Sequence, residues 1–137
     1  MYDLLKEVAT AQSWEFIYAR DDHKNLFDEI EDKSKTYLFL DPVIRDEIDN
    51  DAGELEEVVY SGAFMLVLSS DLDEKTYDDR YQDYIKGLIQ TNNTAIKDSL
   101  KCKSEISVTQ WRTVEVINAL DYNFDGLIVS YTVKEKI

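Results

Sequence analysis

The chain has 137 residues, of which 44% are hydrophobic and 32% charged, so it is long enough for one domain with its own core and too apolar for a disordered segment. Its 29 acidic and 15 basic residues give a net charge of −14, which argues against binding in a duplex groove or on an anionic membrane. The single cysteine, Cys102, excludes an intramolecular disulfide framework and any multi-cysteine metal site. We therefore expect a single domain over residues 1–137 that is stabilised by packing alone.

Neither a secretion signal nor a membrane span is expected. The first ten residues include Asp3, Lys6 and Glu7, which interrupt the apolar stretch that a signal peptide needs. The longest apolar run, Ala63–Leu68, is far too short to cross a bilayer. The expected location is the cytoplasm, or a particle assembled there.

The first forty residues predict a helix and two strands. Apolar residues recur at helical spacing over residues 4–11, which indicates a short amphipathic helix. Residues 14–18 and 37–40 are apolar runs typical of strands, and the second ends before Pro42, which lacks a backbone donor. The charged segment 20–35 is expected to be a loop or a short helix.

Acidic residues are concentrated in the first half of the chain. Residues 1–75 carry 20 acidic and 7 basic side chains, and Asp41–Glu57 alone carries eight acidic side chains against one basic, Arg45. The same segment contains a turn signal at Asn50–Gly53. We interpret it as a solvated acidic loop between two strands, with a site for a cation or a basic partner as the alternative.

The clearest strand is Val58–Ser69, which is apolar on both faces and should therefore be covered on both. Thr76 and Asp79 then form a variant of the capping box, with Asp in place of Glu. They predict the start of one long helix that reaches about Leu100 and carries an apolar stripe beginning at Tyr77.

After Cys102 the apolar pattern returns to a period of two. Alternate positions place four apolar side chains on one face of the predicted strand, namely Ile106, Val108, Val114 and Val116. Trp111 is expected on the opposite face. Residues 127–133 form the last strand. The order of elements predicts an α+β fold, a mostly antiparallel sheet with one long helix packed across one face and a short N-terminal helix.

The segment Asp121–Ile128 matches the opening of an EF-hand calcium loop, with acidic or amide side chains at alternate positions followed by Gly126. Position 12 of such a loop needs a bidentate carboxylate, and here it is Thr132. The residues after the glycine alternate as a strand, whereas an EF-hand continues as a helix. We therefore interpret Asp121–Gly126 as a hairpin turn, with a calcium-binding, monomeric regulatory domain as the alternative.

No arrangement of residues indicates catalysis. His23 is the only histidine and lies beside Asp21 and Asp22 in a polar stretch typical of solvated surface. Cys102 lies between Lys101 and Lys103, which favour a thiolate, but no partner base is evident, so it is expected to be a helix-end residue. We expect no catalytic, cofactor-binding or metal-binding residues and no cofactor; a small hydrolase that uses acidic residues is a second alternative.

Four short segments carry a resemblance to known proteins: Val58–Phe64, Ser69–Asp73, Glu115–Asn118 and Asn123–Gly126. Together with the order of the elements, they resemble small phage and prophage tail-completion proteins of the tail-terminator type, over roughly residues 14–133. The acidic insert from Asp46 to Glu57 is longer and more charged than the family pattern.

The resemblance implies a function without catalysis. In that family a compact α+β subunit assembles into a ring, commonly a hexamer, that caps the tail tube and joins it to the head. The implied partners are further copies of the chain and the tail-tube and head-connector proteins, with no sequence-specific nucleic acid and no membrane. The protein would be cytoplasmic during assembly and then part of the virion tail.

Overall fold

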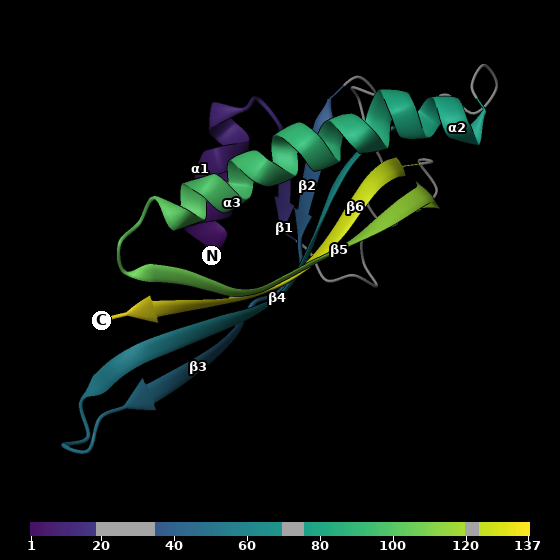
Figure 1. The fold of residues 1–137 in the computed structure, drawn as a ribbon. Helices are drawn as coiled ribbons and strands as arrows, with labels where there is room; N and C mark the ends of the chain where they lie inside the picture. The colour runs from purple at the N-terminus through teal and green to yellow at the C-terminus, as the bar shows by residue number, and fades with distance from the viewer. Residues whose placement is uncertain (19–34, 70–75, 120–123) are drawn as a thin grey trace.

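A computed structural model of the chain describes residues 1–18, 35–69, 76–119 and 124–137 (Figure 1). In chain order the elements are α1 (Tyr2–Ala11), β1 (Glu15–Tyr18), β2 (Thr36–Leu40), β3 (Ile44–Asp49), β4 (Leu55–Ser69), α2 (Tyr77–Arg80), η2 (Tyr81–Ile85), η3 (Leu88–Asn93), α3 (Thr94–Lys101), β5 (Ile106–Ala119) and β6 (Phe124–Lys136). The predicted α+β class is confirmed. Among the described helices, none is both long and apolar enough to cross a membrane.

The described strands form one sheet in the order β1-β2-β4-β6-β5, with β3 paired to β4 as well. Strand β4 pairs with β2 through residues 64–68 and with β3 through residues 55–61, so β2 and β3 follow each other along the same side of β4. Only the β1–β2 pairing is parallel, and the other pairings are antiparallel. The prediction of a mostly antiparallel sheet is therefore confirmed.

All described helices cover the same face of the sheet (Figure 1). Their buried side chains pack with alternate residues of β2, β4 and β6 in the larger of two apolar clusters, which includes Leu5, Leu38, Leu66, Ile96 and Val129. The smaller cluster lies on the opposite face and contains Tyr37, Phe39, Met65, Val67 and Phe124. Both faces of β4 are therefore buried at its C-terminal half, as its two-sided apolar pattern predicts.

The helical region does not form the single long α-helix expected from the sequence. The Thr76 hydroxyl accepts a hydrogen bond from the Asp79 backbone N–H at 3.2 Å, which confirms the predicted cap. After α2, however, residues 81–93 are largely π-helical before α3 begins. Because π turns bond i to i+5, they shift the phase of the side chains. The predicted apolar stripe holds only in part: its members Ile85, Leu88 and Ile96 are buried, whereas Tyr77, where it was expected to begin, is 66% exposed.

The acidic segment is not a loop throughout, because it contains β3 and the beginning of β4. Every residue of β3 is exposed, so the strand has no apolar alternation to reveal it and depends on backbone pairing with β4. The predicted turn at Asn50–Gly53 is present. The Asn50 side-chain oxygen accepts hydrogen bonds from the backbone N–H groups of Ala52 and Glu54.

The predicted phase of β5 is wrong beyond its first residues. The register with β6 shifts between Val108 and Gln110, which is a β-bulge that turns the following side chains to the other face. Trp111 therefore lies on the helix-covered side with Val108, where its Nε1 donates a hydrogen bond to Asn93 Oδ1 at 2.9 Å. Val116 instead packs against the smaller cluster on the opposite face.

Candidate functional site

The structure separates the residues that the sequence singled out for chemistry. His23 and Asp121 lie outside the described residues. Cys102 is exposed and caps the end of α3, which agrees with its prediction as a helix-end residue. Within the described parts of the chain, no group of three or more His, Cys, Asp or Glu side chains is placed to hold a metal ion.

The calcium-like segment belongs partly to a strand. Strands β5 and β6 are antiparallel and pair up to Ala119 and Phe124, so the predicted hairpin is confirmed, although its turn residues 120–123 lie outside the described part. Strand β6 already begins at Phe124, within the predicted loop. The loop prediction was therefore too long at its C-terminal end.

Asp125, the third acidic or amide side chain of that segment, is fully buried against Arg80 of α2. Arg80 Nε donates to Oδ2 at 2.7 Å and Arg80 Nη2 donates to Oδ1 at 2.6 Å. Both side chains are at least 98% buried, and a bidentate pair of this kind is among the strongest polar contacts in proteins. A guanidinium in this position competes with a cation for the carboxylate, which disfavours calcium binding through Asp125.

Sequence reasoning missed this pair, although a signal was present. Arg80 lies four residues before Tyr84 and eight before Leu88, which places it on the apolar side of a helix. A basic residue there needs a buried acidic partner. The sequence does not reveal which acid that is, because 45 positions separate the two residues.

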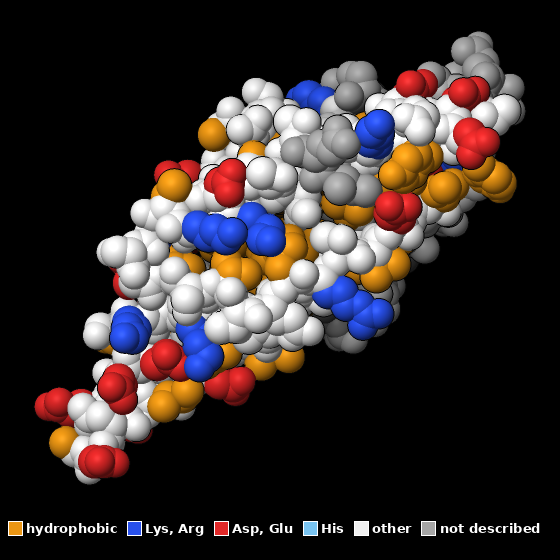
Figure 2. Space-filling view, in the orientation of Figure 1, with side chains coloured by type: hydrophobic (Ala, Val, Ile, Leu, Met, Phe, Trp, Pro, Cys, Tyr) orange, Lys and Arg blue, Asp and Glu red, His pale blue; other side chains and the backbone are white. Residues whose placement is uncertain are grey.

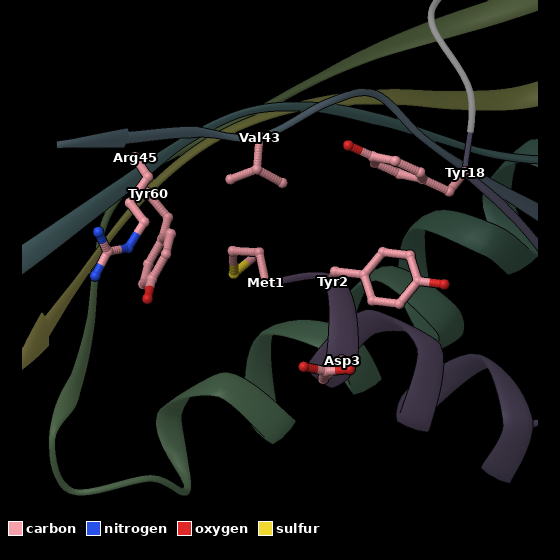
Figure 3. A pocket seen from close by; sticks show the side chains of 7 residues that line it. All are labelled: Met1, Tyr2, Asp3, Tyr18, Val43, Arg45 and Tyr60. Carbon is pink, nitrogen blue, oxygen red and sulfur yellow. The ribbon is translucent and has the colours of Figure 1, made fainter.

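A pocket of about 340 Å³ opens between the start of α1 and the strands β1, β3 and β4 (Figure 3). Met1, Tyr2 and Asp3 line it from the helix side, and Tyr18, Val43, Arg45 and Tyr60 line it from the sheet side. Figure 3 shows Met1 facing Val43, with Arg45 and Tyr60 side by side at one end and the two other tyrosines at the opposite end. The walls are mostly apolar and aromatic, which suits binding more than catalysis.

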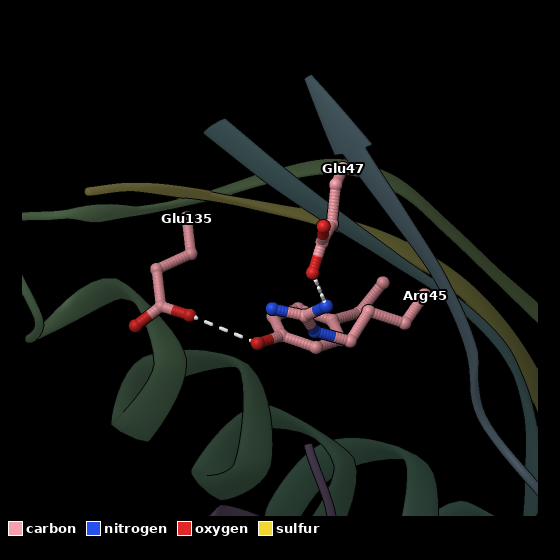
Figure 4. A network of polar contacts seen from close by, with 4 residues as sticks. Arg45, Glu47 and Glu135 are labelled. Atoms are coloured by element: carbon pink, nitrogen blue, oxygen red, sulfur yellow. Dashed lines mark hydrogen bonds and ion pairs between the residues drawn. The ribbon is translucent and has the colours of Figure 1, made fainter. Parts of the chain in front are cut away.

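Polar contacts fix the end of this pocket where Arg45 lies (Figure 4). Arg45 and Glu47, both on β3, form an exposed ion pair. The Tyr60 hydroxyl donates to Glu135 Oε2 of β6 at 3.1 Å. Arg45 and Tyr60 are also cross-strand neighbours in the β3–β4 register. The Tyr60–Glu135 hydrogen bond therefore links β4 to β6 at the half of the sheet farthest from β1, whereas the Arg45–Glu47 ion pair lies within β3.

The sheet face opposite the helices exposes apolar side chains on its outermost strands. We call it the outer face; it carries the residues of β4 at odd positions from 57 to 67 and their partners on neighbouring strands. On this face Ile44 and Ile48 of β3 are 59% and 43% exposed, and Val114 of β5 is 46% exposed. These side chains are the most prominent apolar groups that the outer face presents to solvent.

Tyr131 lies on the helix-covered face opposite Gly62 of β4. A Cβ atom on Gly62 would lie 3.1 Å from the Tyr131 hydroxyl oxygen, so the glycine provides the space for this ring. Burial, with smaller effects of Asp41 and Tyr18, raises the pKa of Tyr131 to about 12. Its hydroxyl has no hydrogen-bond partner within the described parts of the chain.

Comparison with known proteins gives no family assignment. Neither the protein-family models nor the curated proteins match this chain.

Proposed function

We propose that the chain is a structural subunit that forms a homo-oligomeric ring in the tail or neck of a phage or prophage, where it caps the tail tube and joins it to the head. The proposal depends on the resemblance to tail-terminator proteins. The observation that carries it is the outer face of the sheet, where Ile44, Ile48 and Val114 are 43% to 59% exposed.

The outer face offers apolar side chains of β3 and β5 to a partner. The helices already cover one face of the sheet, so the outer face and its edges are the surfaces left for other proteins. Contact with a partner at either edge would cover the exposed apolar side chains of β3 or β5. A contact between two different surfaces of identical chains generates a ring when the rotation closes.

The charge of the chain suits the passage of DNA. A net charge of −14 per subunit repels phosphate, so DNA would pass through such a ring without adhering to it. The acidic first half of the chain is the part expected to face the channel. This arrangement requires no catalytic residue and no cofactor.

The test is the molar mass of the protein in solution. Light scattering at about 50 µM protein, a concentration at which a micromolar contact is mostly formed, should show a closed multimer, either alone or after mixing with tail-tube subunits. Negative-stain electron microscopy should then show rings. Ile44→Lys should lower the mass, whereas Tyr77→Lys, a change at an exposed aromatic residue on α2, should leave it unchanged. A monomer under all these conditions would exclude the proposed function.

A further inference from the structure

Among the described residues, β3 and β5 form the two edges of the half of the sheet that contains the β3–β4 hairpin. The order there is β3-β4-β6-β5, as Figure 1 shows at its lower left. Strands β4 and β6 are paired on both sides, whereas β3 and β5 are each paired on one side only within the described parts of the chain. Edge strands present unpaired backbone N–H and C=O groups that can pair with another chain.

The β3 edge is acidic and the segment that leads into β5 is basic, whereas β5 itself carries one charge of each sign, Arg112 and Glu115. Residues 44–56, which form β3 and its hairpin, have six acidic side chains and one basic. Residues 97–112, which lead from α3 into β5, have four basic side chains and two acidic. Figure 2 shows acidic side chains gathered at the lower-left end, where the hairpin projects. Complementary charges on two surfaces favour contact between them and suppress contact of either surface with itself.

Apolar side chains on the two edges also lie on the same face of the sheet. Ile44 is the cross-strand partner of Ser61, and Val114 is the partner of Ile128, which in turn pairs with Met65 of β4. Ser61 and Met65 are four residues apart on β4, so they lie on one face. If the two edges met, the exposed isoleucines of β3 and Val114 of β5 would extend a single apolar surface.

The directions of the strands permit this meeting. All neighbours in the order β3-β4-β6-β5 are antiparallel, so β5 runs opposite to β3. A copy related by rotation about a ring axis parallel to the strands therefore presents its β5 antiparallel to the β3 of the first copy. We propose that the β3 edge of one copy pairs with the β5 edge of the next, which joins the copies into the ring inferred above; this inference rests on the proposed function.

The register indicates which charges would meet. Asp46 pairs with Val59, Val59 with Lys134 and Lys134 with Ser107, so Asp46 is level with the beginning of β5. Lys101 and Lys103 immediately precede that strand and are exposed. Asp46 and Asp49 of one copy are therefore assigned to Lys101 and Lys103 of the next.

Charge reversal at each edge tests the contact. The acidic-edge variant combines Asp46→Lys with Asp49→Lys, and the basic-edge variant combines Lys101→Glu with Lys103→Glu. Each should raise the dissociation constant at least about tenfold, which corresponds to about 1.4 kcal/mol. The variant with all four changes should recover assembly. Lys6→Glu with Lys86→Glu, at two exposed lysines away from the edges, is the matched control for the basic-edge variant and should assemble normally.

Carbodiimide cross-linking of the unaltered protein tests the same contact without any substitution. Peptide mapping should find Asp46 or Asp49 joined to Lys101 or Lys103 of another copy. If the protein assembles but its cross-links lie elsewhere, or if both edge variants assemble normally, the edge contact is wrong and the ring proposal stands. If the unaltered protein is monomeric under every condition, both proposals are wrong.

Discussion

Arg80 of α2 donates hydrogen bonds to both carboxylate oxygens of Asp125 of β6, at 2.7 and 2.6 Å, inside the protein. This pair fixes the beginning of the helical region to the beginning of the last strand. It also directs the carboxylate inwards, towards the guanidinium, although Asp125 occupies a position that would bind the ion in a calcium loop.

Breaking this pair should be costly. Arg80→Met should lower the free energy of unfolding by about 3–5 kcal/mol, because it leaves the Asp125 carboxylate buried without its counter-charge. Arg80→Met combined with Asp125→Leu should cost less than the sum of the two single changes, because each single variant keeps an isolated buried charge and the double variant keeps none. Urea denaturation measures the free energy of unfolding of the two single variants and of the double variant. The control is Arg112→Met at an exposed arginine, which should change stability by less than about 0.5 kcal/mol; a similar small effect at Arg80 would contradict the prediction.

Two glycines should respond to alanine with opposite signs. A Cβ atom on Gly126 would lie 2.1 Å from the Leu66 carbonyl oxygen and 2.9 Å from Val67 Cα, both of which are backbone atoms of β4. Gly126→Ala should therefore destabilise the protein by about 1–3 kcal/mol or more. Gly87 has helical backbone angles and open space around its Cα, so Gly87→Ala should stabilise the protein by about 0.5–1 kcal/mol. Thermal unfolding of both variants checks the difference.

Stability should fall in alkaline solution because of Tyr131. Its pKa is about 12 in the folded chain and 10.0 for an ordinary tyrosine, so the folded state holds the proton more tightly. This contribution is fully present below pH 10 and is lost as the pH rises from 10 to about 12. Tyr131→Phe should reduce that loss, and near neutral pH it should cost little, because the buried hydroxyl has no partner within the described residues. Denaturation from pH 8 to pH 11.5 tests this, with Tyr77→Phe as the exposed control that should behave like the unaltered protein.

Two substitutions on the outer face should distinguish a buried core position from an exposed contact position. Met65 is 4% exposed and belongs to the smaller apolar cluster, so Met65→Asp should unfold the protein by burying a charge without a partner. Val114 lies on the same face but is 46% exposed, so Val114→Asp should leave a folded subunit with weaker association. Circular dichroism and light scattering distinguish the two results. A folded Met65→Asp protein would show that this side chain is not required for the core.

The sequence by itself determined the elements in which apolar residues repeat regularly. Leu38 and Leu40, Phe64 and Leu66, and Leu127 and Val129 occupy alternate positions in strands that are buried against the helices, so their periodicity is a direct record of burial. The sequence also predicted the Thr76 cap and the Asn50 turn, because each depends on hydrogen bonds between residues a few positions apart.

Only the tertiary structure decided the features that depend on distant partners. Strand β3 exists because β4 supplies its hydrogen-bond partners, although its own side chains are all exposed and show no strand pattern. The bulge near Val108 reverses the phase of β5, and its position depends on the pairing with β6. Arg80 and Asp125 meet across 45 positions of the chain, and the opposed edges β3 and β5 are defined only once the strand order is known. Local sequence encodes burial and short-range hydrogen bonds, whereas strand pairing and buried charge pairs are selected by the energy of the whole fold.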